Sequence, residues 1–191
     1  MKEIKNDERL NMLNHSCAHL LAHAVKHLYP QAKFWVGPVI DEGFYYDIDL
    51  GDVSLTDEDL AKIEKEMKKI SKDNKLIKRI ELSKEEALEM FKDDPYKIDL
   101  INRMDEHEQV ISAYKQEDFI DLCRGPHVNS TKEIKYFKLL KVSGAYWKGD
   151  SKNKMLQRVY GICFENEEDL NEHLAYLEDC KNRDHRKIGK E

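Results

Sequence analysis

This sequence has no apolar run long enough to cross a lipid bilayer, which takes about 20 consecutive apolar residues. Its first eight residues are mostly charged and polar and lack the apolar segment of a secretory signal, so we expect no export. The four cysteines are scattered along the chain and build no compact disulfide framework. These absences argue against a membrane-spanning or disulfide-stapled secreted protein, and they predict a cytoplasmic location without membrane contact.

An excess of positive charge is also missing. The chain carries 32 Lys and Arg against 38 Asp and Glu, so its net charge is -6 at pH 7. Tight binding of duplex nucleic acid needs a basic surface that neutralises phosphates, and this composition argues against it. The balance leaves open a pocket that grips one nucleotide end, or nucleic-acid binding that other domains supply.

The sequence shows no internal repeat and no low-complexity linker. Its 191 residues, 40% of them hydrophobic, suit one generous domain or a domain with a helical appendage. We expect a domain over residues 1–165, followed by a C-terminal helix and linker over 166–191.

Helical and extended segments alternate along the chain. Apolar residues recur at helical spacing in three long segments, 7–29, 57–73 and 166 to beyond 183, and shorter helices are expected over 83–92 and 95–106. β-rich runs predict strands at 34–40, 44–50, 75–82, 109–114, 118–123, 134–142, 144–148 and 155–164. Segregated helices and antiparallel hairpins indicate an α+β fold with helices packed on antiparallel sheets.

The first predicted helix carries a row of histidines. His15 and His19 are four residues apart, which puts both imidazoles on one face, one turn apart, where they are able to hold one metal ion or one water. His23 and His27 extend the row, but the face drifts with each turn, so all four cannot serve one site. By itself the row is also what an ordinary polar helix face shows.

A second pair has the same separation. Cys123 and His127 flank Gly125-Pro126, which predicts a turn. Thiolate and imidazole suit zinc, so His15, His19, Cys123 and His127 form a candidate tetrahedral site, although zinc sites closed by four protein ligands usually stabilise rather than catalyse. Without metal, the same groups are able to bind an ester and activate water.

Longer motifs surround these pairs, in the order HSCAHLL (15–21), GPVIDEGFYYD (37–47), DLCRGPH (121–127), GAYWKGD (144–150) and NKMLQRVYG (153–161). Together they resemble the editing domain of bacterial-type threonyl-tRNA synthetases, from about residue 14 to 190. The closing RDHRKIGK (183–190) resembles that family's link to its aminoacylation domain. The alanyl-tRNA synthetase editing domain shares the two spaced pairs, but the longer motifs are more similar to the threonyl family.

The resemblance implies a proofreading hydrolase that removes serine from Ser-tRNA(Thr). It implies that His15 positions water or acts as general base, that Lys97 stabilises the oxyanion, and that His19, Cys123 and His127 line the site. It also implies that Tyr46 and Asp121 contact the substrate. From the residues alone, Lys97 is a solvated lysine, Tyr46 a core tyrosine and Asp121 a turn-capping aspartate. Attack by the Cys123 thiolate ranks below direct attack by water.

The resemblance also implies partners and cofactors. The partners are the 3′ end of tRNA(Thr) carrying serine and the aminoacylation domain of the parent ligase. No cofactor is expected to be required; zinc is possible at the His/Cys cluster, whereas ATP and a catalytic-core zinc belong only to the full-length parent. The class II catalytic motifs and the small preceding domain of that family are missing, so we expect a chain that cannot charge tRNA by itself, either a fragment or a free-standing protein.

Two other functions remain open at this point. One is a non-catalytic RNA-binding module with a structural zinc site, and the other is a stand-alone deacylase for mischarged tRNA(Ala). Stacking on the terminal adenine is a further possible role for Trp147, Tyr146 and Phe44, although core packing is the more common reason for a phenylalanine such as Phe44.

Overall fold

The computed structural model describes the chain except for residues 1–3, 5, 104–110, 124–126 and 189–191. Two antiparallel sheets and the helices packed against them confirm the predicted α+β class. Among the described residues, no helix is both long and apolar enough to span a membrane.

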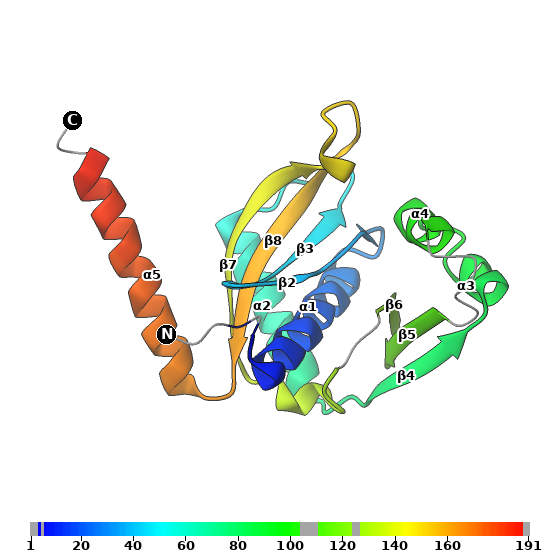
Figure 1. The fold of residues 1–191 in the computed structure, drawn as a ribbon, viewed down its shortest axis with the longest axis horizontal. Helices are drawn as coiled ribbons and strands as arrows, with labels where there is room; N and C mark the ends of the chain where they lie inside the picture. The colour runs from blue at the N-terminus through cyan, green and yellow to red at the C-terminus, as the bar shows by residue number, and fades with distance from the viewer. Residues whose placement is uncertain (1–3, 5, 104–110, 124–126, 189–191) are drawn as a thin grey trace.

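The larger sheet forms the body of the molecule (Figure 1). Its five strands follow the order β1-β3-β8-β7, with β2 also pairing to β3. They are β1 (Lys33–Phe34), β2 (Val39–Ile40), β3 (Gly43–Asp49), β7 (Tyr136–Tyr146) and β8 (Met155–Phe164). Helices α1 (Glu8–Leu28) and α2 (Asp57–Lys72) pack against each other and against this sheet.

Helix α1 is the central element of the core. Asp7 caps its first turn by accepting a hydrogen bond from the backbone N–H of Leu10. Every residue from Ser16 to Val25 is buried, polar ones included. The amide of Asn14 bonds both the N–H and the carbonyl of Cys163 at 2.9 Å, which fixes the helix to β8. A helix stretch buried on all sides presents His19 and His23 to protein rather than to water.

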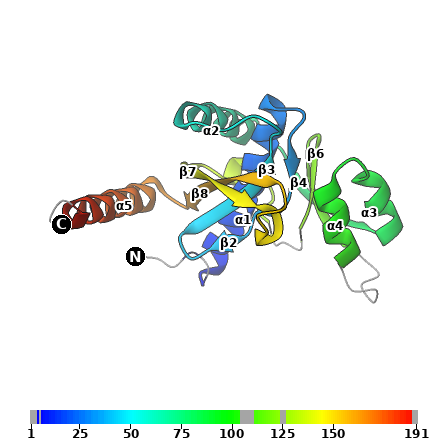
Figure 2. The same cartoon turned by 90° about the horizontal axis from the view of Figure 1, so that it is seen from above.

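The smaller sheet lies at the end of the molecule opposite α5 (Figures 1 and 2). Its three strands follow the order β4-β5-β6, and α3 and α4 pack beside it. Their bounds are β4 (Ile77–Leu82), α3 (Lys84–Met90), α4 (Pro95–Arg103), β5 (Ile111–Gln116) and β6 (Phe119–Leu122). A capping box of Ser83 and Glu86 begins α3.

The C-terminal helix α5 (Glu167–Ile188) projects from the body (Figure 1). Leu170 is buried against the core and Leu174 packs at its edge, whereas Tyr176 is 46% exposed. The apolar contact is therefore confined to the first turns of the helix. The domain boundary expected at residue 165 stays a prediction.

Two strand predictions were wrong in detail. The run expected over 34–40 is divided into β1 and β2, because Pro38 has no N–H to donate to a ladder. The strands expected at 134–142 and 144–148 are one strand, β7, which passes an irregularity at Leu139/Lys141 and stays paired with β8 at Gly144. The first residues of the strand expected from 109, and the end of the helix expected to 106, lie outside the described residues.

Leu28 also differs from expectation. The apolar residues at helical spacing over 7–29 include it, but it is 40% exposed, since α1 ends there and leaves the core.

Candidate functional site

The two spaced pairs meet in the structure. The ring centroids of His19 and His127 are 4.4 Å apart, and those of His15 and His127 are 6.1 Å apart in an edge-to-face arrangement. Side-chain ligand atoms of His19, Cys123 and His127 all lie within 4.8 Å of one another. Helix α1 and the segment after β6 therefore build one cluster, while the turn predicted at Gly125-Pro126 lies outside the described residues.

Ser16 fixes the tautomer of His127. The Ser16 hydroxyl donates to the Met12 carbonyl at 2.8 Å and accepts from the Val128 N–H at 3.0 Å. Its remaining contact, 3.1 Å to His127 Nδ1, must then be a hydrogen bond that Nδ1–H donates. His127 Nε2 is left unprotonated, and it is buried without a hydrogen-bond partner among the residues that the structure describes. A lone pair of this kind is available to a water, a substrate proton or a metal ion.

Burial keeps these histidines neutral. Burial, then the neighbouring Lys97 and His15, lower the pKa of His19 to about 3. Burial, then His19 and His15, lower the pKa of His127 to about 2. Burial also lowers the pKa of His15, which is only partly buried. At neutral pH the cluster thus offers uncharged rings with free lone pairs.

A buried ion pair lies beside the histidines. Lys97, on α4, contacts Asp121 Oδ1 on β6, and both side chains are nearly inaccessible to solvent. Lys97 Nζ also donates to the Trp35 carbonyl at 3.0 Å and to the Tyr46 hydroxyl at 3.3 Å. Tyr46 in turn donates to Asp121 Oδ2. All three ammonium donors are engaged, which holds α4, β3 and β6 together.

The backbone makes room for this network. A Cβ on Gly37 would lie 2.4 Å from the Tyr46 ring, so only glycine lets the ring take this place. Burial and the Asp121 carboxylate raise the pKa of the Tyr46 hydroxyl well above its usual value, so it remains a donor. Asp121 Oδ2 lies 3.6 Å from His19 Nε2, which is beyond hydrogen-bond distance. The ion pair therefore lies next to His19 without a hydrogen bond to its ring.

A cavity opens beside the network. Its volume is about 490 Å³, within the range of small-ligand sites, and its lining includes Lys97, Asp121, Phe34, Phe119 and Asp94. Burial raises the pKa of Asp94. The cavity reaches the same lysine and aspartate that stand beside the histidine cluster.

Zinc fits part of the predicted ligand set. His19, Cys123 and His127 are close enough to share one ion, and the unpartnered Nε2 of His127 is the kind of atom that a metal would bind. His15 is not in that group of described residues. Three protein ligands with an open fourth position are typical of catalytic rather than structural zinc.

Three residues of the site were missed from the sequence. Ser16 sits inside the histidine motif, Trp35 supplies the carbonyl to Lys97, and the Tyr114 ring packs edge-on against His127 with centroids 4.1 Å apart. Only Ser16 had a signal, its place between His15 and His19; the other contacts depend on which distant segments meet.

The aromatic residues proposed for stacking differ in accessibility. Phe44 is 1% exposed and belongs to the core, so a role in stacking on a base is wrong for it. Tyr146 is 40% exposed. The Trp147 ring packs edge-on against Tyr96 and Trp35, at centroid distances of 5.1 and 6.4 Å.

Comparison with known proteins matches this chain to tRNA synthetases. Residues 111–160 match the family described as the threonyl and alanyl tRNA synthetase second additional domain. The chain is 60% identical over 186 residues to the threonine–tRNA ligase of Anoxybacillus flavithermus, which covers 96% of this chain and 29% of that protein. It is 59% identical over 189 residues to that of Oceanobacillus iheyensis (98% and 29%) and 54% over 187 residues to that of Acholeplasma laidlawii (98% and 29%). The chain thus spans about three tenths of the length of these curated relatives.

Proposed function

Because this chain belongs to the second-additional-domain family of threonyl and alanyl tRNA synthetases, on the threonyl side, we propose that it hydrolyses the ester of mischarged Ser-tRNA(Thr). The observation that carries the proposal is the cluster of neutral histidines with an unprotonated, unpartnered His127 Nε2 beside a buried lysine–aspartate pair.

The chemical need for such an activity follows from substrate similarity. Serine lacks one methyl group of threonine, and a missing methylene is worth only about 1–3 kcal/mol in a binding pocket. A second site that admits serine and excludes the larger threonine raises the accuracy of charging. That site must activate water, stabilise an oxyanion and hold the terminal ribose.

His15 is the residue we assign as general base. The pKa values near 3 and 2 make His19 and His127 weak bases at neutral pH, whereas His15 is only partly buried. His15 takes a proton from water as the water oxygen bonds to the ester carbonyl carbon. The bond to the ribose oxygen then breaks, and the proton passes to that oxygen, giving free serine and tRNA.

The remaining residues bind and orient the reactants. His19, Cys123 and His127 line the water or the ester. Lys97 stabilises the oxyanion by exchanging its bond to the Trp35 carbonyl for one to the substrate oxygen. Tyr46 and Asp121 contact the substrate, with a free lone pair of the Asp121 carboxylate facing the serine ammonium group. Metal is not essential in this scheme; a zinc ion at His19, Cys123 and His127 would supply Lewis-acid chemistry when bound.

The wider role follows from the relatives. The curated relatives are ligases, so ATP use and aminoacylation belong to proteins about three times this length. We propose that the partners here are the charged 3′ end of tRNA(Thr) and the aminoacylation part of a threonine–tRNA ligase, in cytoplasmic translation.

A deacylation assay tests the proposal. The chain is incubated with Ser-tRNA(Thr), Thr-tRNA(Thr) and Ser-tRNA(Ala), each with and without a chelator. We expect release of serine from Ser-tRNA(Thr) alone, in both buffers. If isolated tRNA is a poor substrate, the assay is repeated with a threonine–tRNA ligase that mischarges but lacks its own editing.

Other outcomes identify the two alternatives. Release only from Ser-tRNA(Ala) would indicate the alanyl-type deacylase. No release in either format, with a melting temperature that collapses in chelator, would indicate an RNA-binding module with a structural zinc, because such a metal contributes folding energy.

A further inference from the structure

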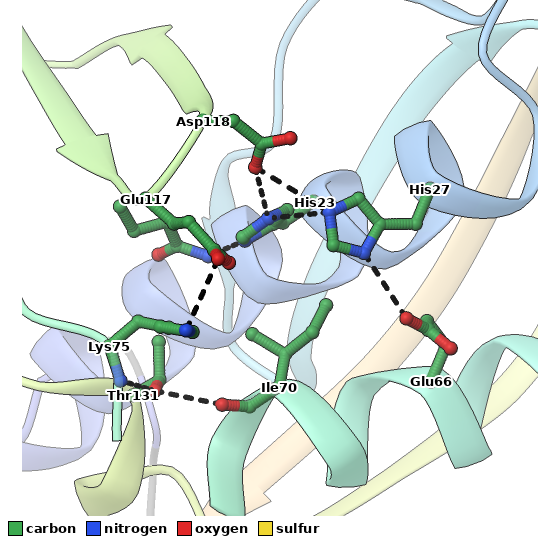
Figure 3. Close-up of polar contacts among 9 residues, drawn as sticks. His23, His27, Glu66, Ile70, Lys75, Glu117, Asp118 and Thr131 are labelled. Carbon is green, nitrogen blue, oxygen red and sulfur yellow. Dashed lines mark hydrogen bonds and ion pairs between the residues drawn. The ribbon is translucent and has the colours of Figure 1, made fainter. Parts of the chain in front are cut away.

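A second cluster of ligand-type side chains lies farther along α1 (Figure 3). His23 and His27, on the last turns of the helix, face Glu117 and Asp118 in the two-residue turn between β5 and β6. One ligand atom from each of these residues lies within 4.8 Å of all the others. None of them belongs to the site described above.

Three of these atoms form a compact triangle. His23 Nε2 is 3.1 Å from His27 Nε2 and 3.1 Å from Asp118 Oδ1, and His27 Nε2 is 3.5 Å from Asp118 Oδ1. Ligands about 2.0–2.1 Å from a tetrahedral zinc ion stand about 3.3 Å from each other. The triangle therefore already has the dimensions of one face of such a coordination sphere.

The outer contacts orient the rings for ligation. Glu66 Oε1, on α2, lies 3.1 Å from His27 Nδ1, so a hydrogen bond from Nδ1–H leaves the Nε2 lone pair directed at the cluster. A carboxylate behind a metal-binding histidine is a recurrent arrangement. His23 Nδ1 lies 2.8 Å from the Gln116 amide, and a half-turn of that amide presents its oxygen to Nδ1–H.

The cluster is accessible to solvent on one side. His23 is fully buried, while the Asp118 side chain is 70% exposed, so the cluster opens to solvent on its carboxylate side. Glu117, which pairs with Lys75 at 3.1 Å, is the nearest further carboxylate.

We propose that His23, His27 and Asp118 bind a divalent transition-metal ion of the zinc type, with Glu117 or water completing the sphere. The site joins α1 to the β5–β6 turn and, through Glu66, to α2. Strand β6 begins directly after Asp118 and carries Asp121, so a bound ion also anchors the strand of the buried ion pair. The proposal does not depend on the proposed hydrolysis.

Zinc titration calorimetry on the 191-residue chain tests the site. Because His19, Cys123 and His127 are also candidate ligands, the titration uses Cys123→Ser as background and adds His27→Gln or Asp118→Asn to it. We expect the background to bind one zinc ion and each added substitution to abolish that binding. Glu66→Gln weakens it by roughly 10- to 100-fold, since it acts through the ring of His27.

A control variant and two further readouts distinguish loss of the site from loss of the fold. Asp41→Asn, an exposed turn carboxylate between β2 and β3, is the matched control and keeps wild-type affinity. Cobalt bound at this site gives ligand-field bands without the thiolate charge-transfer band that Cys123 would produce. Free zinc at 100 times its Kd raises the melting temperature by about 5–10 °C.

The proposal is overturned if the Cys123→Ser chain binds no zinc. It is equally overturned if His27→Gln and Asp118→Asn, folded by circular dichroism, bind zinc as tightly as the background.

Discussion

Helix α1 carries two histidine clusters that share the same four-residue spacing and differ in their partners. His19 lies close to Cys123 and to a third imidazole, His127, which the ring of His15 also contacts, in a mostly buried setting. His23 and His27 face carboxylates, one of them largely exposed. Equal spacing on one helix thus produces two kinds of site, and the segments that pack against the helix decide which.

Charge is handled differently in the two clusters. The Lys97–Asp121 pair lies beside the first cluster, where the pKa values of His19 and His127 are held far below neutral. In the second, acidic side chains contact the imidazoles directly. The first cluster is suited to handling a substrate proton, and the second to holding a cation.

Breaking the buried ion pair should have the largest effect on stability. Lys97→Met leaves Asp121 buried without its cation, which we expect to lower the free energy of unfolding by about 3–5 kcal/mol. Lys148→Met is the control, because Lys148 pairs with Asp99 at 3.0 Å nearer the surface and its loss should cost about 0–1 kcal/mol. Urea denaturation measures both; equal losses would show that the buried pair contributes nothing special.

The next largest effect on stability is expected for Ser16, which contacts the His127 ring; Glu66, which contacts the His27 ring, is its counterpart in the second cluster. Ser16→Ala removes the bonds to His127 Nδ1 and to the buried Val128 N–H, and we expect a loss of about 1–3 kcal/mol. Glu66→Gln, the corresponding change behind His27, should cost less than about 1 kcal/mol without metal, since that contact is exposed. Nitrogen NMR of the rings checks the mechanism: His127 should be the Nδ1–H tautomer in the wild type, and an Nε2–H tautomer would contradict the assignment.

The third prediction concerns how the free energy of unfolding depends on pH. The folded pKa values of His19 and His127, about 3 and about 2, lie below the unfolded value of about 6.5, so protons bind first to the unfolded chain. Their stabilisation is complete above pH 6.5 and is lost as the pH falls toward 3. His127→Asn should flatten the slope between pH 6 and 4 by about 1.4 kcal/mol per pH unit.

Tyr114→Phe is the control for that slope. It keeps a ring against His127 and removes no histidine, so it should keep the wild-type pH dependence. An unchanged slope in His127→Asn would mean that His127 is not held neutral.

Local patterns predicted much of the fold. The apolar periodicity over 7–29 and 57–73 predicted α1 and α2 within a residue or two of their ends. Strand β7 was predicted as two pieces, because its continuity past Gly144 comes from pairing with β8, which local sequence does not show.

The two histidine clusters were predictable only in part. The drift of a helix face indicated that all four histidines cannot serve one site, and the structure places His23 and His27 in a second group. No spacing rule joins Asp118 and Glu66 to that group, since they come from a turn and from another helix. Lys97 entered through family resemblance alone, because only the folded chain shows its contact with Asp121.

The most direct test of the proposed hydrolysis compares His15→Ala with His27→Ala, one histidine from each cluster of the same helix. Hydrolysis of Ser-tRNA(Thr) is measured at pH 7 in the presence of a chelator, with circular dichroism to confirm folding. We expect His15→Ala to lower the rate by about 10²–10⁴-fold, as loss of a general base does, and His27→Ala to keep the wild-type rate. A wild-type rate in His15→Ala, or an equal loss in both variants, would contradict the account.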